Sequence, residues 1–202
     1  MTKITRRILL AGAVALAVTP AAKAADPLKE IRIDWATYNP VSMVLKQKGL
    51  LEKEFAKDGI TVTCVQSAGS NKALEFLNAG SIDFGSTAGS AALVAKINGN
   101  PIKSIYVYSR PEWTALVTKD PSIKKIEDLK GKRVAVTRGT DPHIFLVRAL
   151  LGAGLSEKDI TPVLLQHADG KTALIRGDVD AWAGLDPMMA QAEVEDGARL
   201  FY

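Results

Sequence analysis

Residues 76–84, Phe-Leu-Asn-Ala-Gly-Ser-Ile-Asp-Phe, recur later in the chain as residues 173–181, Ala-Leu-Ile-Arg-Gly-Asp-Val-Asp-Ala. Each copy is typical of the last turn of a helix, a Gly suited to the left-handed conformation that ends it, and a short apolar strand opened by Asp. Each copy then runs into a helix start, at residues 85–87 and at residues 184–187. The repetition predicts two similar α/β lobes that face each other across a cleft, where small ligands bind.

Segments typical of strands and helices alternate along the rest of the chain, which predicts mostly parallel sheets flanked by helices. The predicted strands are residues 31–35, 60–65, 82–85, 102–108, 133–137 and 163–166, with the start of another at 199–202. The predicted helices are residues 40–49, 71–78, 88–97, 143–151 and a helix that begins at Pro187. We expect lobe 1 to span residues 25–114, the crossing between lobes residues 115–119, and lobe 2 residues 120–202.

The first 24 residues form a predicted secretory signal peptide. Lys3, Arg6 and Arg7 precede the apolar run 8–18, which is too short to span a bilayer, and residues 22–24 offer a cleavage site between small residues. The paired arginines are similar to a twin-arginine signal, and the general Sec route fits equally. The mature chain is therefore expected in the periplasm. Removal of the signal peptide takes away four of the 26 Lys and Arg residues and leaves 22 basic residues against 22 acidic ones. The balanced charge argues against nucleic acid and anionic membranes as partners.

The residue types that metal and hydrolase chemistry needs are scarce. The single Cys64 cannot form an internal disulfide and is expected to be a small core residue. Together with His143 and His167 it cannot build an ordinary zinc site without several carboxylates. No Gly-x-Ser-x-Gly nucleophile motif occurs in the sequence. We expect no metal, no cofactor and no enzymatic activity.

Several helix starts share one polar chemistry. Asn39-Pro40, Asp141-Pro142 and Asp186-Pro187 each place an N-cap side chain before a Pro at the first helical position. Ser70 and the pair Ser86 and Thr87 can do the same. In a parallel α/β lobe these turns lie along the carboxyl edge of the sheet, which is where ligands bind.

Long motifs along the chain carry a family resemblance. Residues 77–87, 128–135 and 177–182, with Asp186-Pro187, closely resemble the periplasmic substrate-binding proteins of ABC importers, above all the aliphatic sulfonate, taurine and nitrate binders. The resemblance implies a type II-like, two-lobed α/β protein, a monomer that closes on one small anionic ligand and delivers it to an inner-membrane permease. It also implies a longer chain, so we expect the second lobe and the return crossing to be incomplete here.

The resemblance also implies which residues bind the ligand. They are Thr37, Tyr38, Asn39, Ser67, Gly69, Ser70, Ser86 and Thr87 in lobe 1, and Thr140, Asp141, His143, Trp182 and Asp186 in lobe 2. Helix-start amides and hydroxyl groups can hold the oxygens of an anion without a full countercharge. Trp182 could wall the carbon chain of the ligand or lie in the core.

Asp141 departs from the family pattern, which usually has a small hydroxyl residue or Ala there. If Asp141 caps its own helix it is harmless to a sulfonate, whereas in the cleft it favours an amine-bearing ligand such as taurine. Nitrate, bicarbonate and a pyrimidine precursor stay open as ligands, and a non-functional fragment stays open as well. The related pyrimidine synthases need a cysteine-rich segment, and a regulatory domain needs a DNA-binding helix pair where this chain has a signal peptide.

Overall fold

The computed structural model describes residues 27–202, so the predicted signal peptide lies outside the described residues. The strands are β1 (Glu30–Trp35), β2 (Thr61–Gln66), β3 (Thr114–Thr118), β4 (Arg133–Val136), β5 (Thr161–Leu164), β6 (Ala181–Leu185) and β7 (Arg199–Leu200). The helices are α1 (Pro40–Lys48), α2 (Leu50–Phe55), α3 (Ser70–Asn78), α4 (Gly89–Ile97), α5 (Asp141–Gly152), α6 (His167–Arg176) and α7 (Met188–Asp196), with short 3-10 helices at Ala56–Asp58, Ile126–Leu129 and Glu157–Asp159. No helix among the described residues is long and apolar enough to cross a membrane.

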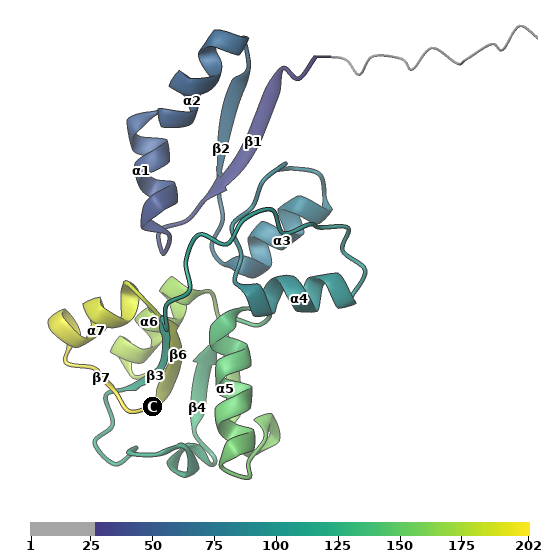
Figure 1. Cartoon of the computed structure of the whole chain (residues 1–202). Coiled ribbons are helices and arrows are strands. Elements are labelled where there is room, and N and C mark those ends of the chain that lie inside the picture. Colours follow the sequence, from purple (N-terminus) through teal and green to yellow (C-terminus); the bar gives the residue numbers. More distant parts are fainter. Residues whose placement is uncertain (1–26) are drawn as a thin grey trace, which may run out of the picture.

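Two separate sheets define two lobes, one above the other in Figure 1. Lobe 1 contains the parallel pair β1 and β2 with α1 to α4, and lobe 2 contains a five-stranded sheet in the order β5-β4-β6-β3-β7 with α5 to α7. In lobe 2, β4 runs parallel to β5 and β6, whereas β3 runs antiparallel to β6 and β7. The predicted class, two α/β lobes with mostly parallel sheets flanked by helices, is confirmed.

The core of lobe 2 lies on both faces of its sheet, because successive side chains of a strand point to opposite faces. On one face Leu116 and Val134 pack with Leu146 and Leu150 of α5. On the other face Trp182 packs with residues of α6 and α7. Both faces are covered by helices, which explains why β3 and β6 are buried along nearly their whole length.

The sequence repeat corresponds to one arrangement made twice. In lobe 1 the Arg32 side chain binds Asp83 (Nη2 to Oδ1 2.7 Å) and the Gly80 carbonyl (2.6 Å), while the Arg32 amide donates to Asp83 Oδ2 (2.8 Å). In lobe 2 Arg133 makes the same contacts with Asp180 (Nη2 to Oδ1 3.0 Å, amide to Oδ2 2.8 Å) and the Gly177 carbonyl (3.1 Å). The repeated Asp therefore ties the turn after each helix to a strand of its lobe, β1 in lobe 1 and β4 in lobe 2.

Two predicted strands of lobe 1 are wrong. Residues 82–85 form only a single parallel bridge, between Phe84 and Ile33. Residues 102–108 form no strand, and Ile105, Tyr106 and Val107 are exposed. A strand needs a neighbour whose backbone groups pair with its own, and among the described residues 102–108 have none. The composition of that segment was not enough to make it a strand.

Most of the segment expected to cross between the lobes, residues 115–119, forms a strand. Residues 115–118 belong to β3, which lies inside the lobe 2 sheet between β6 and β7. We now propose that the crossing is the irregular segment 98–113, which joins α4 of lobe 1 to β3 of lobe 2 (Figure 1).

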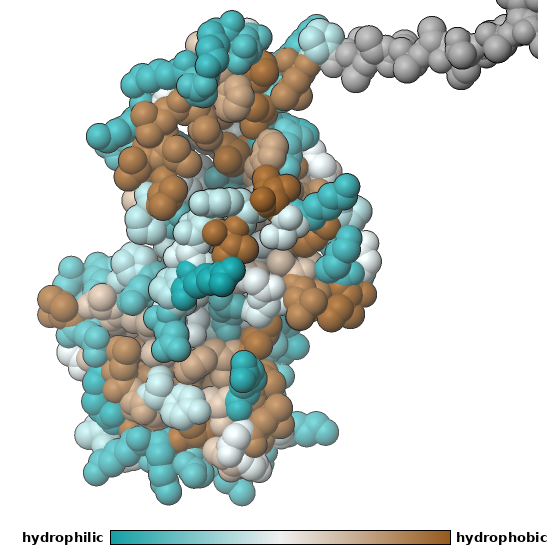
Figure 2. Space-filling view, viewed as in Figure 1, coloured by the Kyte–Doolittle hydropathy of each residue, from teal (hydrophilic) through white to brown (hydrophobic). Residues whose placement is uncertain are grey.

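Lobe 1 has the smaller core. Its buried apolar cluster is Leu74, Ala88 and Ala91, and Val41, Met43, Val44 and Leu50 are exposed on α1 and α2. Figure 2 shows hydrophobic side chains gathered on this side of lobe 1. Cys64 is half-buried, with its sulfur 3.9 Å from Glu52 Oε1, and burial raises the pKa of its thiol.

Candidate functional site

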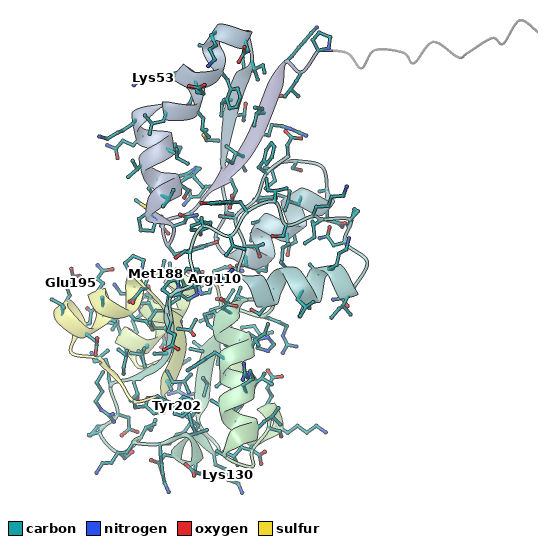
Figure 3. The ribbon with its side chains drawn as sticks, in the orientation of Figure 1. Lys53, Arg110, Lys130, Met188, Glu195 and Tyr202 are labelled. Atoms are coloured by element: carbon teal, nitrogen blue, oxygen red, sulfur yellow. The ribbon has the colours of Figure 1, made fainter. Side chains whose placement is uncertain are left out.

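A cavity with a volume of about 40 Å³ lies between the two lobes. Its lining comes from helix starts and turns of both lobes and from the crossing segment. The lining residues are Tyr38, Ser70, Ser86, Thr87, Ala88, Tyr108, Trp113, Thr140, Asp141, Pro142, His167, Leu185 and Asp186. Figure 3 places Arg110, which lies on the crossing segment, at the level of the gap between the lobes.

The lobe 1 wall is organised by a buried carboxylate, Asp34, behind the cavity. Asp34 is 4% exposed and accepts three hydrogen bonds: from Ser67 Oγ (2.7 Å), the Ser86 amide (2.7 Å) and Ser86 Oγ (3.0 Å). A hydroxyl group has a single proton to donate. Ser67 and Ser86 therefore direct their protons to Asp34 and present only oxygen lone pairs elsewhere.

Two other groups of lobe 1 keep a proton for a ligand. Ser70 Oγ accepts from the Ala88 amide (3.0 Å), which leaves its own proton free. The buried Tyr38 hydroxyl has no hydrogen-bond partner among the described residues. Burial raises the pKa of Tyr38 to about 12, so the phenol stays protonated at neutral pH and can donate.

The lobe 2 wall contains a buried histidine. His167 is 1% exposed, contacts Thr137 Oγ1 through Nδ1 (3.1 Å) and packs edge-on against Tyr38 of lobe 1 at 5.8 Å between ring centroids. Burial lowers the pKa of His167 to about 4, so the ring is neutral at pH 7. Beside it, Thr140 donates its hydroxyl proton to the Thr137 carbonyl (2.6 Å).

Asp141 faces the other lobe and does not cap its own helix. The N-cap of α5 is Thr140, and Asp141 is the first helical residue. Its carboxylate accepts from the Ser90 hydroxyl of α4 and from Trp113 Nε1 (3.2 Å) on the crossing segment. Of the two places considered for Asp141, the structure therefore selects the cleft.

The cavity includes about half of the residues expected from the sequence. Tyr38, Ser70, Ser86, Thr87, Thr140, Asp141 and Asp186 line it. The remaining six lie elsewhere.

Three of these six belong to lobe 1 turns: Thr37 is exposed, Asn39 caps α1 by accepting from the Ser42 amide (3.2 Å), and Ser67 lies behind the wall with Asp34. Gly69 lies where an added Cβ would be 3.3 Å from His167. In lobe 2, His143 contacts Glu157 (3.1 Å) and Trp182 is in the core.

Trp182 cannot wall the ligand because it is fully buried in β6. Its ring occupies space that two glycines leave free: a Cβ at Gly170 or at Gly184 would lie 2.8 Å from it. Of the two roles considered for Trp182, the structure supports the core residue.

Six lining residues are not among the site residues predicted from the sequence: Ala88, Tyr108, Trp113, Pro142, His167 and Leu185. His167 could have been found, because it begins the helix after β5 just as Ser70 begins the helix after β2. Tyr108 and Trp113 carried no such signal, since residues 102–108 were predicted to be a strand and residues up to 114 to belong to lobe 1.

Two α/β lobes with a polar cavity between their helix starts match the architecture of two-lobed binding proteins. The NMT1/THI5-like family matches residues 44–200, and the chain belongs to this family. The resemblance to the binding proteins of ABC importers is confirmed by the relatives described next.

Three proteins similar to this chain are named for sulfonate binding. A protein of Escherichia coli (strain K12), provisionally named for aliphatic sulfonate binding, is 34% identical over 198 residues, which are 96% of this chain and 60% of the relative. The alkanesulfonate-binding protein SsuA from Xanthomonas axonopodis pv. citri, bound to MOPS, matches with a TM-score of 0.78 and 33% identity, over 86% of this chain and 60% of that one. The periplasmic aliphatic sulphonate binding protein SsuA from Escherichia coli matches with a TM-score of 0.64, 33% identity and the same coverage.

This chain thus spans about 60% of the length of these relatives. A more distant relative has a different role: a 4-amino-5-hydroxymethyl-2-methylpyrimidine phosphate synthase of Uromyces fabae is 29% identical over 82% of this chain and 48% of its own length.

Proposed function

We propose that this chain is the solute-binding component of an ABC importer, or part of one, and that it captures a small sulfonate-type ligand in the cavity between its lobes. The observation that carries the proposal is that helix starts of both lobes, at Ser70 and Thr140, line one cavity. The names of relatives at 33–34% identity supply the ligand class.

The chemistry of the cavity supports an acidic group at one end. The first turn of α3, on the lobe 1 side, leaves amides without a partner within the helix, and the positive end of the helix dipole favours an anion there. The Tyr38 and Ser70 hydroxyls add two donors. A hydrogen bond to a charged group contributes about 1.5–3 kcal/mol, so four of them cover the roughly 8 kcal/mol of micromolar binding.

We propose binding and not catalysis as the activity. The thiol of Cys64, on β2, is not among the residues that line the cavity, and relatives at 33–34% identity are named as binding proteins. By the same relatives, we propose a periplasmic location, export by the Sec or twin-arginine route, and delivery of the ligand to an inner-membrane permease.

Thermal melting of the full chain with and without ethanesulfonate, taurine (2-aminoethanesulfonate) or nitrate tests the proposal. At a hundredfold excess over the dissociation constant, a ligand adds roughly 2.7 kcal/mol, or about 5–10 °C in Tm for a chain of this size. A cooperative transition that neither sulfonate raises would contradict sulfonate binding. A rise with nitrate alone would redirect the assignment to an inorganic anion.

A further inference from the structure

The charges that line the cavity are negative. Asp141 and Asp186 are the acidic residues among its described lining residues, and no Lys or Arg is among them. Asp34 adds a third carboxylate directly behind Ser86. Asp141 has two neutral donors, Ser90 and Trp113, and no cationic partner within ion-pair distance among residues 27–202. A ligand that carried only negative charge would therefore meet like charge on the lobe 2 side.

The hydrogen bonds of Thr137 fix the proton on His167. Thr137 Oγ1 lies 2.8 Å from the Leu165 carbonyl, which can only accept, so the single hydroxyl proton of Thr137 points there. The same oxygen must then accept from His167 Nδ1–H at 3.1 Å. In a neutral imidazole the other nitrogen, Nε2, carries a lone pair. His167 consequently offers the ligand an acceptor.

The two walls of the cavity differ in the hydrogen-bonding groups that they present to a ligand. Lobe 2 presents the acceptors Asp141, Asp186 and His167 Nε2, and the Thr140 proton is already bound to a backbone carbonyl. Lobe 1 keeps the donors Tyr38 and Ser70. A ligand that satisfies both walls has an acceptor-rich acidic group at one end and N–H donors at the other.

We propose that the ligand is a small zwitterion of the aminoalkanesulfonate class, with its protonated amine against Asp141 and its acidic group against Tyr38 and Ser70. This inference rests on the proposed function and narrows its ligand class. The aromatic rings of Trp113 and Tyr108 also line the cavity, and such rings attract a cation through their faces.

Isothermal titration of the full chain with three probes of matched size tests the proposal: 2-aminoethanesulfonate, 2-hydroxyethanesulfonate and ethanesulfonate. They share the acidic group and the two-carbon chain, and only the first carries a positive charge. We expect the amine to bind at least tenfold more tightly than the hydroxyl analogue, which is about 1.4 kcal/mol. Asp141→Asn, which keeps the side-chain shape, should reduce this ratio to about threefold or less.

Asp58→Asn is the matched control, because it removes the same charge from an exposed position on lobe 1, in the 3-10 helix Ala56–Asp58, and should leave the ratio unchanged. Asp186→Asn provides a second cavity variant should Asp141→Asn fail to fold. If the hydroxyl or unsubstituted sulfonate binds as tightly as the amine, the zwitterion proposal is overturned while sulfonate binding stands. If a folded chain binds none of the three, the proposed function and this inference both fail.

Discussion

Removing the buried Asp34 carboxylate should destabilise lobe 1 and loosen the cavity wall. Asp34→Ala leaves three donors without their acceptor: the Ser67 hydroxyl, the Ser86 hydroxyl and the Ser86 amide. Each hydrogen bond to a charged group contributes about 1.5–3 kcal/mol. The Ser86 hydroxyl can turn toward the cavity and bind water, so we count the other two bonds fully and expect a loss of about 4 kcal/mol.

Urea unfolding followed by circular dichroism measures this loss, which corresponds to roughly 8–16 °C in Tm. Amide hydrogen exchange supplies a local readout, since the Ser86 amide donates to Asp34 Oδ1 at 2.7 Å and should exchange much faster in the variant. Asp34→Asn retains one acceptor oxygen, so its free energy of unfolding should lie between those of Asp34→Ala and the parent. Asp58→Asn should behave like the parent. A loss below about 1 kcal/mol for Asp34→Ala, with Ser86 still protected, would refute this account of the wall.

Two further predictions concern lobe 2. The pKa of His167 is about 4 in the folded state and about 6.5 in the unfolded chain, so between pH 4 and pH 6.5 the folded state binds fewer protons than the unfolded chain. The free energy of unfolding is therefore retained above pH 6.5 and falls by about 3 kcal/mol as the pH drops to 4. Urea unfolding of the parent and of His167→Gln at pH 7 and pH 4.5 isolates this contribution, and equal pH dependence of the two proteins would contradict it. Gly184→Ala would place a Cβ 2.8 Å from the Trp182 ring, so we expect a loss of about 1–3 kcal/mol from overpacking. Gly152→Ala, where an added Cβ meets nothing within 4 Å, is the matched control, and equal melting temperatures for these two variants would rule out the packing explanation.

Some local signals in the sequence predicted the local structure, although the N-caps of α5 and α7 are Thr140 and Pro187 and not the expected Asp141 and Asp186. Asn39 caps α1 with Pro40 at the first position, and Gly49 ends that helix in the left-handed conformation with φ 56°. The repeated Gly and Asp of residues 76–84 and 173–181 make matching contacts in the two lobes. These features depend on backbone conformation and on residues a few positions apart, which a sequence displays directly.

Long-range pairing was the first point at which prediction failed. Residues 102–108 have an apolar composition typical of a strand, yet they lie exposed and unpaired among the described residues, whereas residues 115–118 form a strand inside the lobe 2 sheet. Pairing depends on which other segment lies alongside, and composition does not carry that information.

The sequence by itself determined the two lobes, the helix starts at the carboxyl edges of the sheets and the general position of the cavity, because these follow from periodicity, caps and turns. Only the tertiary structure decided what the polar groups of the cavity offer a ligand. The proton of Ser86 goes to Asp34, Asp141 reaches across to Ser90, and Trp182 turns into the core. A hydroxyl group has one proton to donate, and the acceptor that binds this proton comes from a distant part of the chain.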